Sequence, residues 1–348
     1  MSIHCGLDVH SKTTTVYWLD DETGEEGRPC TVPNDELAAH LQALPEAPQV
    51  IMEAGSISRF VKRQLESCQI EAVVVDAHKA HRVLEAVNSQ TKTDKADARG
   101  LAMLSARGWA EDIKVWVPDT QAHHLRQLTR AREKASGLSN QVRNEIRALL
   151  RGEGFQCPAE RLTSPKATAW MDEIAQRLDP LTRQILHSFR ELLAAIVKQI
   201  ADFDAMLEEA VAEDKRCQQL TTIIGCSTVT AAAVVAEIGD ISRFDDAKAL
   251  RRYAGLTPRI EQSGERTKIG HLVEQCNKHL RRALILIAQC FAHNKRLEDT
   301  RIRRQYYRCL FRHGPNPAKV DAARRLCDII FAMLRDGTDF DPGRLALA

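Results

Sequence analysis

The chain has 348 residues, of which 44% are hydrophobic and 28% are charged, and its net charge is only +2. This length exceeds one ordinary core, so we expect two domains and a connecting element. The opening "MSIHCGLDVHSK" lacks the apolar run of a signal peptide, and no later stretch is long enough to span a membrane. We therefore expect a cytoplasmic protein without a membrane partner. The ten cysteines form no C-x-x-C pair, which argues against a zinc ribbon and a disulfide framework.

The small net charge conceals a basic carboxyl-terminal half. Residues 295–325 hold ten Lys or Arg against three acids, and residues 243–282 hold ten against five. Surfaces of this kind bind phosphate backbones. Within "RIRRQYYRCLFRHG", Tyr306, Tyr307 and Phe311 stand among arginines, as stacking side chains do in a nucleic-acid groove. The alternative is an amphipathic helix with a wet basic face and an aromatic core face, and we favour nucleic-acid binding.

The amino-terminal third predicts an α/β layer fold. Three strands are expected in "IHCGLDVHS", "TTTVYWLD" and "GRPCTVP", and two buried strands in "PQVIMEA" and "IEAVVVDA". Helical spacing appears in "NDELAAHLQAL" and "SISRFVKRQLESC", with Asn34 and Ser56 as expected caps. Three antiparallel strands followed by alternating helices and strands indicate helices layered on a sheet.

Beyond Asp94 the pattern is almost wholly helical. In a first long helix, apolar residues recur at every seventh position: Leu128, Ala135, Val142 and Leu149. In a second, apolar residues alternate spacings of three and four: Leu186, Phe189, Leu193, Ile196, Ile200, Phe203 and Leu207. This seam predicts a coiled coil, whose partner is either the first helix or another subunit. A compact helical region follows, interrupted by a loop-like stretch, "AGLTPRIEQSGERTKIGH".

Four acidic residues stand where metal chemistry is possible. Asp94 and Asp97, in "SQTKTDKADARG", are three apart and share one helix face. Alone, this pair favours a plain helix start, capped by Thr93 and stabilised by the dipole. Asp8 interrupts the first strand pair, and Glu53 ends a buried strand. Together, four hard oxygen ligands suit Mg²⁺ or Mn²⁺ and two-metal phosphoryl transfer.

The order of these acids resembles the RuvC-like, ribonuclease-H-type domain of the insertion sequence 110 transposases, whose relatives include the Piv DNA invertase. The resemblance lies in "GLDVHSK", "IMEAGS" and "KTDKADARGLA". It implies that the family's four metal-binding, catalytic carboxylates are Asp8, Glu53, Asp94 and Asp97. A second block, "IIGCSTVTAAAVVAEIGDISRF", "LRRYAGLTPRIEQSGERTKIG" and "NKHLRRALILIA", is similar to the family's carboxyl-terminal transposase domain. The resemblance runs from about Ile3 to Ala332.

The second block contains a candidate nucleophile, Ser263. By residue type alone, a serine followed by glycine in a polar loop is typical of a turn, and its hydroxyl needs a base or a metal to become reactive. The resemblance implies that family members join DNA covalently through the serine at this position. Arg259, Arg266 and Lys268 flank it and could hold a phosphate. The general base is open among Glu261, Glu265 and His271.

These observations predict three parts. Residues 1–115 form a ribonuclease-H-like (RuvC-like) α/β catalytic domain, residues 116–215 form long coiled-coil helices, and residues 216–348 form a mainly α-helical transposase domain that carries the serine. The predicted nucleic-acid-binding residues are Arg259, Arg266, Lys268, Arg281, Arg282, Arg303 and Arg304.

The resemblance implies a DNA transposase or site-specific recombinase of an insertion sequence, which cuts and rejoins DNA through a covalent serine intermediate with Mg²⁺ (or Mn²⁺) as cofactor. It also implies a structured noncoding RNA as a guide. Because exchanging strands between two DNAs requires several active sites, we expect a homodimer or homotetramer. Three alternatives remain: a DNA invertase of Piv type, a metal-only nuclease of the Holliday-junction type, and an inactive nucleic-acid-binding protein.

Overall fold

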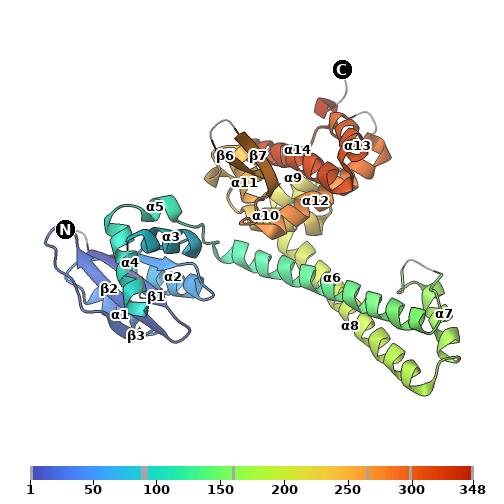
Figure 1. Ribbon diagram of the computed structural model, residues 1–348, viewed down its shortest axis with the longest axis horizontal. Helices are drawn as coiled ribbons and strands as arrows, with labels where there is room; N and C mark the ends of the chain where they lie inside the picture. Colours follow the sequence, from blue (N-terminus) through green and yellow to red (C-terminus); the bar gives the residue numbers. More distant parts are fainter. Residues whose placement is uncertain (1–2, 88–92, 159–160, 264–265, 298–299, 346–348) are drawn as a thin grey trace. The chain divides into compact units, whose positions relative to one another are not determined.

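The computed structural model describes residues 3–87, 93–158, 161–263, 266–297 and 300–345; for residues 86–87, 260–263 and 266–269 it describes only the backbone. The chain divides into two compact units, Met1–Val117 and Pro118–Ala348 (Figure 1). The predicted division into residues 1–115, 116–215 and 216–348 stays a prediction. Within the described ranges, no helix combines the length and the apolar character needed to cross a membrane.

A five-stranded mixed sheet forms the centre of the first unit (Figure 1). Its strands are β1 (Ile3–Val9), β2 (Thr13–Asp20), β3 (Cys30–Pro33), β4 (Gln49–Glu53) and β5 (Ala72–Val75). The strand order is β3-β2-β1-β4-β5, in which β1, β2 and β3 pair antiparallel while β1, β4 and β5 pair parallel. All five strands predicted from the hydrophobic pattern are present.

Helices cover both faces of this sheet. They are α1 (Leu37–Gln42), α2 (Ser58–Ser67), α3 (Ala77–Val87), α4 (Asp94–Ala106) and α5 (Ala110–Ile113). Because successive strand residues point to opposite faces, Met52 packs in the core that α1 and α2 share, whereas its neighbour Ile51 packs in the core beneath α3, α4 and α5. This two-sided burial explains why the parallel strands are continuously apolar.

Of three predicted caps, one is confirmed and two are wrong. Thr93 caps α4 by accepting a hydrogen bond from the Ala96 backbone N–H at 3.2 Å. Asn34 does not cap α1, which begins at Leu37; its side chain accepts a bond from the Thr14 hydroxyl and donates to the His10 carbonyl. The side chain of Asn34, which the local pattern assigned to the cap of α1, therefore forms hydrogen bonds with residues of the hairpin between β1 and β2 instead. Ser56 does not cap α2 either, because that helix begins at Ser58.

The second unit is mostly helical (Figure 1). Its helices are α6 (Thr120–Gly152), α7 (Pro165–Ala175), α8 (Pro180–Val211), α9 (Lys215–Thr221), α10 (Thr228–Ile238), α11 (Ala247–Tyr253), α12 (Lys278–His293), α13 (Arg301–His313) and α14 (Pro315–Asp336), with short 3-10 turns η1 (Ile241–Arg243), η2 (Lys295–Leu297) and η3 (Pro342–Leu345). One expectation is wrong: the stretch predicted to be a loop forms an antiparallel hairpin of β6 (Pro258–Ser263) and β7 (Arg266–Leu272). Cross-strand pairing supplies the backbone partners that a polar segment needs.

The two long helices of this unit, α6 and α8, pack against each other along the predicted seam. Ala135 and Val142 of α6 are buried in one cluster with Leu193 and Ile196 of α8. A salt bridge from Arg132 to Asp204, 2.8 Å long, joins the first half of α6 to the second half of α8. Within this chain, α6 is therefore a packing partner of α8. That the two helices form a coiled coil, and that another subunit packs on them, stay predictions.

A larger core gathers α10, α12 and α14 around buried residues that include Ala231, Leu284, Phe291 and Leu326.

Candidate functional site

Two aspartates and a histidine come together at one edge of the first unit. Asp8 lies near the end of β1, His10 follows that strand, and Asp94 is the first residue of α4. The Nε2 atom of His10 lies 3.3 Å from Asp8 Oδ2 and 3.2 Å from Asp94 Oδ2. One potential ligand atom from each of the three residues lies within 4.8 Å of the other two. Three donors this close can hold one divalent cation.

Small residues allow α4 to approach β1 this closely. A Cβ atom added at Gly6 would stand 2.0 Å from the carbonyl oxygen of Ala98 and 2.6 Å from the backbone nitrogen of Ala102. Both alanines are fully buried. Only glycine therefore fits in β1 beneath this helix. The capped first turn of α4 then places Asp94 beside Asp8, where the free N–H groups and the helix dipole favour negative charge.

The other two predicted carboxylates flank this cluster. Leu7 of β1 pairs with Met52 of β4, so Asp8 and Glu53 are the next residues of two adjacent parallel strands. Asp97 lies in the same first turn of α4 as Asp94. Both Glu53 and Asp97 are half-buried, and neither carboxylate joins the group of ligand atoms within 4.8 Å. The structure thus gathers two of the four predicted acids, Asp8 and Asp94, and places the other two on α4 and on the neighbouring strand β4.

His10 is the member of the cluster that sequence reasoning missed. It stands two residues after Asp8 in "GLDVHSK". Since strand residues two apart face the same way, that spacing was an available signal. Its second contact, with Asp94, joins residues far apart in the sequence.

The predicted nucleophile lies on the hairpin of the second unit. Ser263 is the last residue of β6, and its backbone pairs in register with Arg266 of β7. One residue pair intervenes before Glu261, which pairs with Lys268. The side chains of Ser263, Arg266 and Lys268 lie outside the described residues. Arg259, nearer the base of the hairpin, is exposed.

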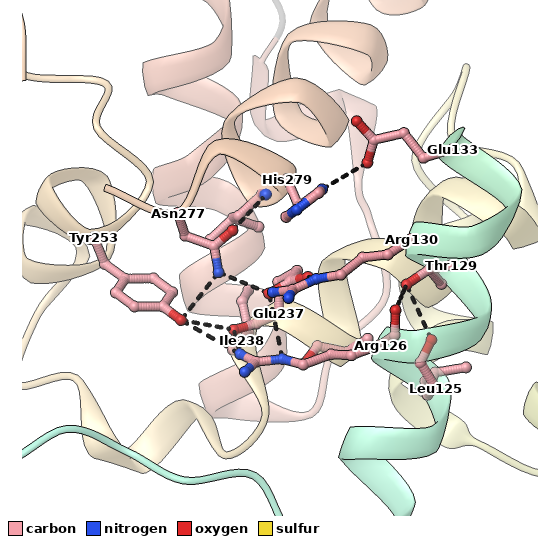
Figure 2. Close-up of polar contacts among 12 residues, drawn as sticks. Leu125, Arg126, Thr129, Arg130, Glu133, Glu237, Ile238, Tyr253, Asn277 and His279 are labelled. Atoms are coloured by element: carbon pink, nitrogen blue, oxygen red, sulfur yellow. Dashed lines mark hydrogen bonds and ion pairs between the residues drawn. The ribbon is translucent and has the colours of Figure 1, made fainter. Parts of the chain in front are cut away.

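Both ends of this hairpin are tied to one another and to α10 (Figure 2). Asn277, which caps α12 after β7, donates its backbone N–H to the carbonyl of Tyr253, which ends α11 before β6. The Asn277 side-chain amide also donates to Glu237 Oε2 at 2.7 Å and to the Tyr253 hydroxyl at 3.0 Å. The Tyr253 hydroxyl in turn donates to the Glu237 carbonyl. These bonds fix where the serine hairpin leaves the helical core.

Glu237 also connects α10 to the long helix α6. Its side chain is 1% exposed and forms ion pairs with Arg130 at 2.7 Å and Arg126 at 3.3 Å. Burial alone would raise the pKa of Glu237, but the hydrogen bonds from Arg130, the charge of Arg126 and the bond from Asn277 outweigh burial, so the pKa lies below its ordinary value. The Glu237 carboxylate is therefore charged, and it links α10 to α6 through the two arginines and to the base of the hairpin through Asn277.

Two of the predicted nucleic-acid-binding arginines make internal contacts. Arg281 donates to the carbonyls of Ala254 and Val273, and thereby braces the chain on both sides of the hairpin. Arg303 donates to the carbonyl of Ala292 and lies over the ring of Tyr307.

Two others lie near the surface of the same unit. The guanidinium of Arg282 pairs with Glu133 of α6 at 2.8 Å, and Arg304 is exposed on α13. Arg304 is therefore accessible to solvent, and its predicted role in binding nucleic acid stays a prediction.

The aromatic residues of α13 differ sharply in exposure. Tyr306 is 2% exposed and belongs to the core, so its predicted role in stacking is wrong. The reason is helical geometry, because Tyr306 follows Ile302 by one turn on the buried face. Tyr307 is half-buried, and Phe311 is 86% exposed.

Two family descriptions match the chain. Residues 5–154 match a transposase family of the DEDD type found in IS110 elements, a range that contains the Asp8, His10 and Asp94 cluster. Residues 217–307 match the "Transposase IS116/IS110/IS902 family", a range that contains Glu237 and the serine hairpin.

Several curated proteins are similar to the chain over much of its length. It is 26% identical to a protein named as a transposase in Sinorhizobium fredii over 72% of this chain, a match that spans 60% of that protein's length. It is 22% identical to the transposase for insertion sequence element IS1328 of Yersinia enterocolitica, over 84% of this chain and 85% of that protein. It is 24% identical to the pilin gene-inverting protein of Moraxella bovis, over 97% of both chains. With both matched domains in order along one chain, the protein belongs to the IS116/IS110/IS902 family of transposases.

Proposed function

We propose that the protein is the transposase, or site-specific recombinase, of an insertion sequence, and that it cuts and rejoins DNA through a covalent bond between Ser263 and a DNA phosphate. The observation that carries this proposal is the gathering of Asp8, His10 and Asp94 at the start of α4, inside the range that matches the DEDD transposases. The strand order β3-β2-β1-β4-β5 supports a ribonuclease-H-like assignment for that unit.

The donor set fits a divalent cation. Carboxylate oxygens are the ligands that Mg²⁺ and Mn²⁺ prefer, and we propose that Asp8, Glu53, Asp94 and Asp97 form the catalytic metal-binding set, with His10 at the same edge. A bound cation would supply Lewis-acid stabilisation of charge on the reacting phosphate and its oxygens.

The proposed reaction is a transesterification. The Ser263 oxygen attacks the DNA phosphorus, so that an O–P bond forms to serine and the O–P bond to one DNA oxygen breaks. The serine proton passes to a base among Glu261, Glu265 and His271, and the leaving DNA oxygen takes up a proton as a hydroxyl. Attack by a DNA hydroxyl on the serine phosphodiester reverses these steps, so one phosphodiester is exchanged for another without an energy-rich cofactor. Arg259, Arg266 and Lys268 hold the phosphate.

We further propose that the reaction requires both the acids of the first unit and Ser263 of the second unit, and that the enzyme acts as a homodimer or homotetramer. The proposed partners are the DNA of the element ends and of the target, and a structured noncoding RNA that guides the enzyme. The basic composition of the carboxyl-terminal half supports nucleic-acid partners.

A covalent-trapping experiment tests the mechanism. The full-length protein is incubated with labelled element-end DNA and Mg²⁺ or Mn²⁺, and adducts that survive denaturing detergent are counted. We expect an adduct with the wild type and with Ser188→Ala, a control at an exposed serine of α8. Ser263→Ala should give none, and Asp94→Asn should reduce its formation at least about a hundredfold. An undiminished adduct with Ser263→Ala would overturn the proposed nucleophile.

Two alternatives have distinct outcomes. Cleavage that persists in Ser263→Ala without any adduct would identify a metal-only nuclease of the Holliday-junction type. A DNA invertase is favoured by the similarity to the Moraxella bovis pilin gene-inverting protein, which covers 97% of both chains. A plasmid that carries a segment between inverted sites distinguishes the two recombinases, because an invertase flips the segment and a transposase inserts DNA elsewhere.

A further inference from the structure

The outer face of α13 combines four arginines with one exposed aromatic ring. Arg301, Arg304, Arg308, Phe311 and Arg312 are spaced three, four, three and one residues apart, so they lie on one side of the helix. All five are exposed, and Phe311, at 86%, is the most exposed large apolar residue among those whose side chains the structure describes.

The opposite face of α13 fixes this orientation. Ile302 and Tyr306 are 3% and 2% exposed and belong to the main core of the second unit. Thr300 caps the start of the helix by accepting a bond from the Arg303 N–H. Because this face is anchored, Phe311 stays in solvent unless a partner covers it.

The positive charge of the outer face is not neutralised within the described part of the chain. The segment 301–313 contains no acidic residue. Arg304, Arg308 and Arg312 have no ion pair with any residue that the structure describes. Arg308 donates a long hydrogen bond, 3.5 Å, to the uncharged side-chain amide oxygen of Gln305. Arg303, by contrast, is turned inward to the Ala292 carbonyl and the Tyr307 ring.

We infer that this face binds an unpaired nucleic-acid strand, with Arg304, Arg308 and Arg312 on its phosphates and Phe311 stacked against one base. The inference rests on the proposed function for the presence of nucleic acid, and adds the strandedness of the nucleic acid and the residues that bind it. Arginines that track a backbone beside an aromatic platform are the common design of single-strand binding sites.

The chemistry of the face selects this partner. In a duplex the base faces are already stacked, so an exposed ring gains nothing from them, whereas an unstacked base offers its face to Phe311. A protein partner needs a desolvated apolar centre. On this side of α13 the apolar contribution is a single phenylalanine, surrounded by guanidinium groups that suit phosphates.

Binding of the full-length protein to fluorescent oligonucleotides tests the inference. The probes are oligothymidine and oligouridine of about 20 nucleotides and a duplex of mixed sequence. Phe311→Ala should weaken binding to the single strands about tenfold and leave duplex binding within about twofold. Phe311→Tyr should restore single-strand binding. Leu192→Ala, at a 48% exposed residue of α8, serves as the control and should change neither.

The arginines are tested through salt dependence. Arg304→Ala or Arg308→Ala should reduce the slope of log affinity against log salt by about 0.7 for single strands, the value expected for one lost phosphate contact. A stronger effect on oligouridine than on oligothymidine would identify RNA as the strand, and the reverse would identify DNA.

Two results would overturn the inference: Phe311→Ala binding single strands like the control, or weakening duplex and single strand equally. Covalent trapping through Ser263 is scored separately in each variant. An adduct without Phe311-dependent binding refutes this inference alone, and Phe311-dependent binding without any adduct refutes the proposed reaction alone.

Discussion

Arg130 holds the carboxylate of Glu237 with two parallel hydrogen bonds, from Nε to Oε1 at 2.7 Å and from Nη2 to Oε2 at 2.9 Å (Figure 2). A bidentate pair of this kind fixes direction as well as distance. Because Glu237 also accepts a bond from Asn277 at the base of the serine hairpin, one buried side chain relates the position of α6 to that of β6 and β7.

Glu237→Gln should lower the free energy of unfolding by about 3 kcal/mol, because it leaves the largely buried Arg126 and the partly exposed Arg130 without their common counter-charge. Urea unfolding measures this loss. Hydrogen exchange should also become faster at the backbone N–H of Asn277, because the Glu237 network supports its hydrogen bond to the Tyr253 carbonyl. The control is Glu191→Gln on α8, an exposed residue paired with His187, which should cost less than about 0.5 kcal/mol. Equal losses in the two variants would contradict the role of Glu237.

The same residue predicts a loss of stability in acid. The folded-state pKa of Glu237 is below its ordinary value of 4.5, so the stability it contributes is complete above 4.5 and disappears as the pH falls through the lowered pKa. The difference in unfolding free energy between the wild type and Glu237→Gln should therefore be constant near neutral pH and shrink in acid. Urea titrations at several pH values measure it, and a difference that grows on acidification would have the wrong sign.

Gly6→Ala should destabilise the first unit by about 2 kcal/mol or more, because the new Cβ would overlap backbone atoms of α4 that cannot move independently. Thermal unfolding and exchange of the β1 amides measure the effect. The matched control is Gly55→Ala, close to Glu53 in sequence, where an added Cβ meets nothing within 4 Å. The proposed packing is wrong if both variants melt like the wild type.

Local patterns were sufficient for most of the fold. The buried strands β4 and β5 follow from short apolar runs, and the start of α4 follows from Thr93, whose cap bond reaches only three residues along the chain. The errors arose where distant partners decided the outcome. Asn34 bonds to Thr14 and His10 across a hairpin, and the segment ending at Ser263 gains strand structure only by pairing with β7.

The candidate site could be predicted only in part for the same reason. The acids were found as a set of residue types in order, but the contact of His10 with Asp94 depends on how α4 lies on β1. The Glu237 network joins residues more than a hundred positions apart, since Arg130 and Glu237 are 107 residues distant. The charge pattern alone does not distinguish Arg303, which points inward, from Arg304, which is exposed. The positions of the two residues around the helix do distinguish them.

Removal of single donors should reveal the metal site. Binding of Mn²⁺ to the full-length protein, measured by electron paramagnetic resonance, should weaken at least about tenfold in Asp94→Asn and also weaken in His10→Ala, because both side chains belong to the group within 4.8 Å. The loss of the favourable dipole interaction at the start of α4 costs only about 0.5 kcal/mol, so Asp94→Asn should remain folded by circular dichroism. Asp112→Asn, at an exposed aspartate of α5 in the same unit, is the control and should bind like the wild type. Unchanged Mn²⁺ affinity in both Asp94→Asn and His10→Ala would show that Asp8, His10 and Asp94 form only a surface ion-pair cluster. The proposed metal-binding role of these residues would then be wrong.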